Sequence, residues 1–236
     1  NSLEPHIVGP HTPDLARPVS RLKEDALKNK YPMQISSALI GSCTNSSYED
    51  IGRAAFIARE AAKKGLKSKV PLMVTPGSEQ TRATIERDGY LKDLEAIGAT
   101  VLANACGPCI GQWKRDDIKE GDSNSIVSSY NRNFPARNDG NAETLSFIGS
   151  PESVIGLALG GSLDFDFLSE TLINENGDEV KLTPPVADEL PAAGFEQTLE
   201  GFIQPSESSE GIQVIIDPQS SRLQALEPFE AFDKNN

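Results

Sequence analysis

Short apolar segments alternate with amphipathic segments through the first two thirds of the chain, and this alternation constrains the fold most. Strands are predicted at 35–40, 70–75, 99–103 and 125–130, and helices at 21–31, 46–65, 79–88, 91–97 and 151–159. Strands that alternate with helices are typical of a mostly parallel sheet with helices on both faces. The sequence therefore predicts an α/β protein with a three-layer α/β/α arrangement.

Chemically distinctive residues follow the predicted strands. Cys43 follows the first strand, Cys106 and Cys109 follow the third, and Arg132 and Arg137 follow the fourth. In parallel sheets, ligands bind beyond the carboxyl ends of the strands. We therefore expect these five residues to form one composite site.

Cys43 lies just before a predicted helix start. Ser46 with Glu49, or Ser47 with Asp50, fits a capping box. The free N–H groups and partial positive charge of a helix N-terminus lower the pKa of a nearby thiol. The position of Cys43 therefore favours its thiolate form.

The three cysteines allow several kinds of site. Cys106 and Cys109, separated by Gly-Pro, could form a redox pair, which leaves Cys43 without a role. A zinc site needs a fourth ligand, which His6 or His11 could supply. An iron–sulfur cluster normally takes four thiolates, so three would leave one iron open for Lewis-acid chemistry.

The loop that follows the fourth strand contains two arginines in one polar stretch, 131–139. Forked guanidinium groups bind carboxylates in a bidentate manner, although a role as ordinary surface arginines is also compatible with the sequence. Asn131 fits either ligand orientation or turn formation. Trp113 is interpreted as a packing residue beside the cysteine turn.

Charge divides the chain unevenly. Residues 1–161 contain 19 acidic and 19 basic residues, whereas 162–236 contain 16 acidic and 3 basic residues and so supply the net charge of −13. An acidic surface disfavours nucleic acid and anionic membranes as partners. Neither a membrane span nor a signal segment is predicted. The odd cysteine count favours a reducing compartment, and Asn1 in first place indicates a processed form or a piece of something longer.

The C-terminal third is predicted to be irregular. A hairpin is expected at 172–180, with Asn176-Gly177 as a type I′ turn. Residues 196–211 are rich in Glu, Ser and Gly, which is typical of a linker. One more strand is predicted at 213–216.

Several motifs together resemble the aconitase family, in its mitochondrial form rather than isopropylmalate isomerase or the iron-regulatory relative. They are Gly-Ser-Cys-Thr-Asn-Ser-Ser-Tyr-Glu-Asp at 41–50, Cys-Gly-Pro-Cys-Ile-Gly-Gln-Trp at 106–113 and Tyr-Asn-Arg-Asn-Phe at 130–134. Shorter matches are Leu-Glu-Pro-His at 3–6, Thr-Pro-Gly-Ser-Glu-Gln at 75–80, Thr-Ile-Glu-Arg-Asp-Gly at 84–89 and Leu-Glu-Pro-Phe at 226–229. The resemblance spans almost the whole chain.

The resemblance implies a [4Fe–4S] cluster held by Cys43, Cys106 and Cys109, and substrate contacts from Asn131, Arg132 and Arg137. The implied reaction is the interconversion of citrate and isocitrate through cis-aconitate, within the tricarboxylic acid cycle of the mitochondrial matrix. One local departure is Ala136, which replaces a glycine common in the family. A small backbone adjustment is expected there.

The resemblance covers one part of a longer enzyme. It implies a cluster-binding third domain at 1–195 and an acidic linker at 196–236, which leads toward a fourth domain. The family's Asp–His pairs and its catalytic serine base have no counterpart here, so no catalytic residue is expected in this chain and the isolated chain is expected to be inactive. The remaining aconitase domains are the expected partners; a zinc-binding module and a related hydro-lyase such as homoaconitase are the alternatives.

Overall fold

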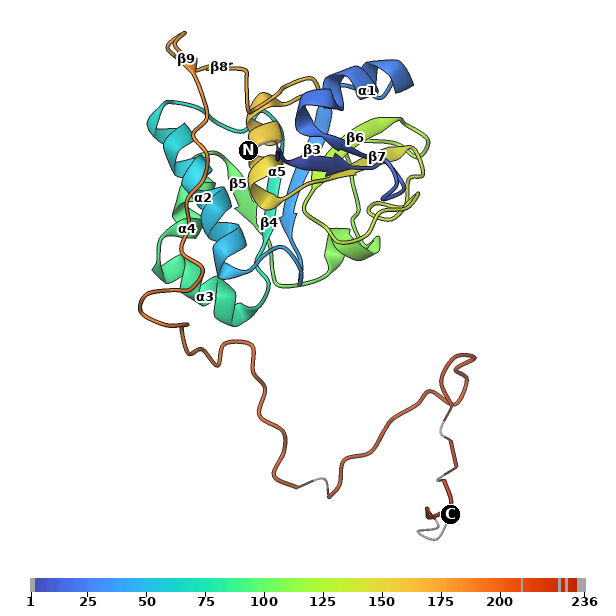
Figure 1. Ribbon diagram of the computed structural model, residues 1–236. Helices are drawn as coiled ribbons and strands as arrows, with labels where there is room; N and C mark the ends of the chain where they lie inside the picture. Colours follow the sequence, from blue (N-terminus) through green and yellow to red (C-terminus); the bar gives the residue numbers. More distant parts are fainter. Residues whose placement is uncertain (1–2, 209, 225, 228, 233–236) are drawn as a thin grey trace. The chain divides into compact units, whose positions relative to one another are not determined.

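A seven-stranded sheet forms the centre of the protein, shown in Figure 1 as a computed structural model that describes residues 3–208, 210–224, 226–227 and 229–232. The chain divides into two units, Asn1–Glu200 and Gly201–Asn236. The first unit contains the sheet and the α-helices. In the described residues of the second unit there is no helix and no strand.

The sheet is mostly parallel. Its strand order is β2 (Ala16–Pro18), β1 (His6–Val8), β7 (Thr144–Ile148), β6 (Asn124–Ser128), β3 (Ile35–Gly41), β4 (Leu72–Thr75) and β5 (Ala99–Val101). The five strands from β7 to β5 run parallel, and β1 and β2 add an antiparallel edge beside β7. The predicted α/β fold with a mostly parallel sheet is confirmed.

The α-helices contribute to the large apolar core on one face of the sheet. They are α1 (Leu22–Asn29), α2 (Tyr48–Lys63), α3 (Glu79–Arg87), α4 (Tyr90–Ala96) and α5 (Pro151–Gly160). Ala38, Ile40 and Val127 contribute to this core from the sheet, together with buried side chains of all five helices. Alternate residues of a strand point to opposite faces of the sheet. Leu39 in β3 and Ile126 in β6, which are adjacent to these residues, therefore point to the other face.

The other face carries a second, smaller apolar cluster. Leu39 and Ile126 pack there with Cys109 and Tyr130, and Trp113 is partly buried against them. The connections β5–β6 and β6–β7 contribute these last three residues, and the first of these connections includes the 3₁₀ helix η2 (Gly107–Ile110). The layer on this face is thus formed by connections and η2, whereas the sequence predicted helices on both faces, and one of the three thiols is part of this layer.

Three strands were not predicted. The prolines of residues 1–20 indicated only extended chain, yet β1 and β2 pair there, and η1 (Val19–Arg21) follows. Of the two strands only β2, at the edge of the sheet, contains a proline, which is tolerated there because part of the backbone of an edge strand faces away from the ladder. The strand β7 has only five residues, and its alternation of polar and apolar residues is brief. Its strand conformation is evident from its pairing with β6.

Two predictions for the C-terminal third were wrong. The hairpin of β8 (Leu172–Ile173) and β9 (Glu179–Val180) forms, but its turn is not type I′. Gly177 has a φ of 88° whereas Asn176 has no positive φ, and the Asn174 side chain accepts hydrogen bonds from the N–H groups of Asn176 and Asp178. The strand predicted at 213–216 is absent, because those described residues have no ladder partner.

Candidate functional site

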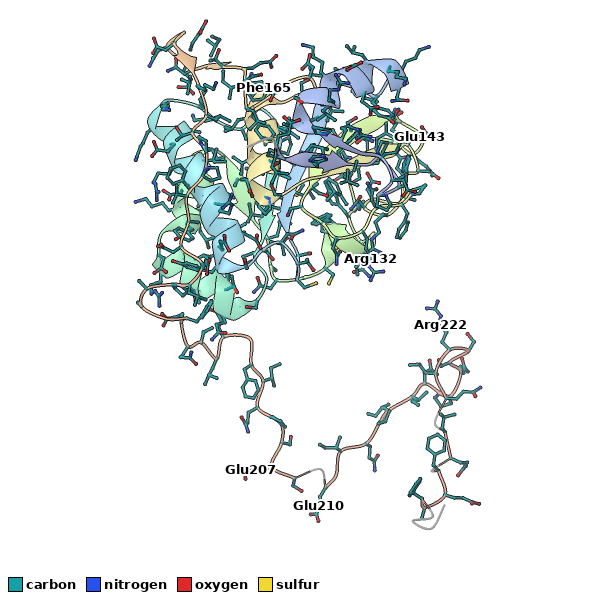
Figure 2. The ribbon with its side chains drawn as sticks, viewed as in Figure 1. Arg132, Glu143, Phe165, Glu207, Glu210 and Arg222 are labelled. Atoms are coloured by element: carbon teal, nitrogen blue, oxygen red, sulfur yellow. The ribbon has the colours of Figure 1, made fainter. Side chains whose placement is uncertain are left out.

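Three loops at the carboxyl ends of parallel strands carry the predicted site residues. The first follows β3 and contains Cys43, the second follows β5 and contains Cys106 and Cys109, and the third follows β6 and contains Arg132. Figure 2 shows Arg132 at the end of the sheet toward which the arrows of β3 and β4 point in Figure 1. The topology thus brings the three loops to one edge.

The loop after β3 is fixed by unusual backbone angles. Gly41 has a φ of 97°, and a Cβ there would collide with the carbonyl oxygen of Thr75. Ser42 and Asn45 also have positive φ, 130° and 54°. Residues held in such regions persist only when the surroundings determine them. The loop therefore presents the exposed Cys43 in a defined conformation.

Hydrogen bonds anchor this loop to Ser129, the first residue after β6, and to the start of α2. The Oγ of Ser129 accepts from the N–H of Gly41 at 2.9 Å, and the Nδ2 of Asn45 donates to the carbonyl of Ser129 at 2.8 Å. Ser47 and Asp50 form the capping box of α2, which selects between the two boxes that the sequence allowed. Hydrogen bonds therefore hold the loop on both sides of Cys43, at Gly41 before it and at Asn45 and Ser47 after it.

The Cys106–Cys109 turn is tight. The N–H of Cys109 donates to the carbonyl of Cys106 at 2.7 Å. The Nδ2 of Asn138 donates to the carbonyl of Pro108 at 3.0 Å, which ties the turn to the loop after β6. Cys106 is exposed and Cys109 is buried. The two thiols therefore differ in access to solvent.

Asn131 links the cysteine loops. Its Oδ1 lies 3.9 Å from the Sγ of Cys109, and its Nδ2 donates to the Oγ1 of Thr44 at 3.4 Å. The same Oγ1 lies 3.7 Å from the Sγ of Cys43. Asn131, a predicted substrate-binding residue, thus contacts both loops that carry the predicted cysteine ligands.

The thiols do not form a preassembled site for a single ion. Within the described part of the chain, no group of three or more His, Cys, Asp or Glu side chains is close enough to hold one metal ion. The predicted zinc ligand His6 is in β1, where its Nδ1 lies 3.0 Å from the carbonyl of Glu4. The other, His11, lies between β1 and β2.

The two arginines share one loop but differ in surroundings. Arg132 is exposed, whereas Arg137 is half-buried. The guanidinium of Arg137 lies 5.1 Å from the centroid of the Phe134 ring. Its Nε is buried and has no hydrogen-bond partner among the described residues. This side chain thus has unused donor capacity.

Electrostatic effects at the site come from burial and from local ion pairs. Burial raises the pKa of Tyr130, and the Coulombic interaction with the neighbouring Cys109 raises it further. Arg82 lowers the pKa of Glu79, whose Oε2 accepts from the Nδ2 of Asn104 at 2.7 Å. That bond anchors the segment between β5 and Cys106 to the start of α3.

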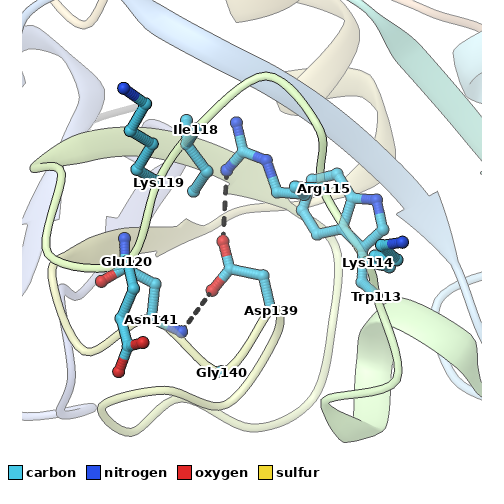
Figure 3. Close-up of a pocket in the computed structure, with 9 residues that line it drawn as sticks. All are labelled: Trp113, Lys114, Arg115, Ile118, Lys119, Glu120, Asp139, Gly140 and Asn141. Carbon is cyan, nitrogen blue, oxygen red and sulfur yellow. Dashed lines mark hydrogen bonds and ion pairs between the residues drawn. The ribbon is translucent and has the colours of Figure 1, made fainter.

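Sequence reasoning missed several residues that support the site. Thr44 and Asn138 are in the motifs but were given no role. Arg115 and Asp139, 24 residues apart, meet at the floor of a pocket of ≈ 340 Å³ beside Trp113, shown in Figure 3. Nothing in the sequence indicates this pairing, since the contact depends on how two connections fold together.

The described residues contain no helix with the length and hydropathy needed to cross a membrane.

These features define a class: an α/β protein that presents three cysteine thiols and two arginines at the carboxyl edge of a parallel sheet. The model of the Aconitase family (aconitate hydratase) matches residues 1–161. The chain belongs to the aconitase family.

Individual relatives cover the whole chain. "Probable aconitate hydratase, mitochondrial" of Dictyostelium discoideum is 51% identical over 236 residues, which are 100% of this chain and 31% of the relative. "Aconitate hydratase, mitochondrial" of Saccharomyces cerevisiae and of Candida albicans are each 54% identical over 233 residues, 99% of this chain and 30% of each relative. The chain thus spans about 30% of the length of these relatives.

Proposed function

We propose that this chain is the cluster-binding part of a mitochondrial aconitate hydratase, a hydro-lyase that interconverts citrate and isocitrate through cis-aconitate. The observation that carries the proposal is the position of Asn131, which contacts Cys109 on one side and Thr44, the neighbour of Cys43, on the other. Membership of the family and the mitochondrial names of the relatives support it. We place the chain in the matrix, within the tricarboxylic acid cycle.

The donor set fits a [4Fe–4S] cluster. Three thiols on two loops provide three soft ligands, and a cluster distributes them over three of its irons, so they need not converge on one ion. When bound, the cluster would supply an iron without a protein ligand that acts as a Lewis acid on the substrate hydroxyl. Cys43, Cys106 and Cys109 would hold it.

The chain's own residues would bind and orient the substrate. Arg132 and Arg137 present forked donors suited to carboxylates, and the free Nε of Arg137 adds a donor. Asn131 has an amide that already reaches both cysteine loops. The substrates of this site would be tricarboxylates.

We assign no general base to this chain. Removal of a proton from the substrate carbon needs a base within hydrogen-bond reach, and we propose that the remaining domains of the enzyme provide it. The isolated chain would therefore bind a cluster with little or no turnover.

Anaerobic reconstitution with iron and sulfide tests the proposal. We expect about four irons and four sulfides per chain, with a visible absorption band that is lost in Cys106→Ser. Arg132→Lys serves as the matched control, since it should load the cluster as well as the wild type does but bind citrate more weakly in calorimetry. Stoichiometric zinc without sulfide uptake would favour the zinc-binding module instead.

A further inference from the structure

A buried ion pair lies at the amino-terminal ends of β3, β6 and β7 and has no part in the chemistry proposed so far. The side chains of Arg115 and Asp139 are each 2% exposed, and the Nη1 of Arg115 lies 3.3 Å from the Oδ2 of Asp139. Burial of two charges is costly unless their remaining donors and acceptors are satisfied. The hydrogen-bond partners of both residues therefore show which segments the ion pair connects.

Arg115 connects its own loop to two central strands. Its Nη2 donates to the Oγ of Ser36 in β3 at 3.1 Å, and its Nη1 donates to the Oδ1 of Asn124 in β6 at 2.9 Å. Its Nε donates to Asp117 in the same loop at 3.0 Å, and this contact lowers the pKa of that carboxyl. The whole guanidinium fork is used.

Asp139 connects the β6–β7 connection to the start of β7. It accepts from the Oγ1 of Thr144 at 2.7 Å and from the N–H of Asn141 at 3.0 Å. Figure 3 shows its carboxylate between Arg115 and Asn141. The ion pair therefore joins the connection that carries the cysteine turn to the connection that carries the arginines.

Each partner reaches the cysteine turn through an intermediate residue, Trp113 for Arg115 and Asn138 for Asp139. The guanidinium of Arg115 stacks over the Trp113 ring at 4.7 Å, and Trp113 packs against the cluster that contains Cys109. Asn138, adjacent to Asp139, donates to the carbonyl of Pro108 inside the cysteine turn. The pair thus supports that turn from two sides.

We propose that Arg115 and Asp139 are positioning residues that fix the Cys106–Cys109 turn relative to the loop of Arg132 and Arg137. The functional meaning of this role rests on the proposed cluster and substrate site. Apolar residues of similar volume often stabilise a buried position as well as an ion pair does or better. Stability alone therefore does not explain why this position holds an ion pair that is bonded to both functional connections.

The reactivity of the Cys109 thiol provides a test that needs no metal. We choose Arg115→Lys, which keeps the charge but replaces the planar fork by a single ammonium that cannot reach Ser36, Asn124 and Asp139 together. The cysteine turn should then open more often. We expect Cys109 to react with an aromatic disulfide reagent at least about tenfold faster, with little change for the exposed Cys43.

The control separates positioning from loss of stability. Leu94→Ala on α4 creates a cavity in the core on the opposite face, and the two variants are compared at equal free energy of unfolding, set with urea. Faster reaction of Cys109 in Arg115→Lys alone supports the proposal. Equal rates in both variants would overturn it.

A second variant covers the case in which Arg115→Lys does not fold. Arg115→Met combined with Asp139→Leu removes both charges, so no unpaired charge stays buried. We expect this variant to fold and still to lose protection of Cys109; a folded variant with wild-type protection would contradict the proposal. The thiol measurement is independent of iron, so failure of the wild type to take up a cluster would count against the proposed function and leave this result standing.

Discussion

Ala136 has a backbone conformation that is unfavourable for a residue with a Cβ atom. Its φ of 61° lies in the left-handed region, next to Arg137 in the proposed substrate loop. The Cβ of an L-residue costs roughly 1–2 kcal/mol there. The backbone at position 136 therefore has a conformation that suits glycine, and the small adjustment expected from the sequence stays a prediction.

Replacement of Ala136 by glycine should stabilise the protein. Relief of the Cβ strain is partly offset by the roughly 0.4–1 kcal/mol that the greater freedom of glycine in the unfolded chain costs, so a gain of up to about 1.6 kcal/mol is expected in urea unfolding. Ala192→Gly is the control, because Ala192 has no positive φ and should lose stability. A loss in both variants would show that position 136 carries no strain.

Asp88 makes stability depend on pH. The hydrogen bond from Arg87 lowers the pKa of this carboxyl, and the hydroxyl of Tyr48 donates to it at 2.9 Å. A lowered folded-state pKa contributes stability above the unfolded pKa of about 3.9, and that stability is lost as the pH falls through the folded pKa. Asp88→Asn should therefore be less stable than the wild type at pH 7, with a difference in Tm that shrinks toward pH 3. An equal difference in Tm at pH 7 and pH 3 would contradict this prediction.

At the scale of elements, the start of α2 determines how Cys43 is presented. The Ser47 side chain accepts from the N–H of Asp50 while Asp50 accepts from the N–H of Ser47. This reciprocal cap satisfies two donors that the helix leaves free. The loop that carries Cys43 ends at this cap, so its geometry depends on the helix start.

Ser47→Ala should cost about 1 kcal/mol of unfolding free energy and speed the reaction of Cys43 with thiol reagents. Ser78→Ala removes the cap of α3, whose Ser78 accepts from the N–H of Thr81 at 3.0 Å, and serves as the matched control. It should lose similar stability without affecting Cys43. Equal effects of both variants on the Cys43 thiol would contradict a local role of the α2 cap.

At the scale of the whole molecule, the features that depend on local sequence patterns were predicted, whereas those that depend on contacts between distant segments were not. The buried strands from β3 to β6 and the capped helices follow from short-range periodicity, so the sheet edge that gathers Cys43, Cys106, Cys109, Arg132 and Arg137 was predictable. The Arg115–Asp139 pair and the pairing of β1 with β7 depend on partners far along the chain. The turn type at Asn176-Gly177 failed because the Asn174 side chain selects another turn.

The limits of the folded unit were proposed at residue 195 from composition, and the contacts of the next residues allow a sharper proposal. The carboxylate of Glu196 lies 3.2 Å from Arg87, and that of Glu200 lies 3.0 Å from Arg82. The N–H of Glu196 also donates to the Oγ1 of the buried Thr84 at 2.9 Å. We therefore place the end of the stable unit at residue 200, where the first unit ends.

Two truncated chains test this boundary. The chain 1–200 should unfold with the same free energy as the full chain, because it retains every contact of the first unit. The chain 1–195 loses two exposed ion pairs, each worth about 0–1 kcal/mol, and one hydrogen bond worth about 1 kcal/mol, so a loss of about 1–3 kcal/mol is expected. Urea unfolding of the three chains side by side measures both differences. Equal stability of the two truncated chains would return the boundary to 195, and a loss in the chain 1–200 would show that residues beyond 200 contribute to folding.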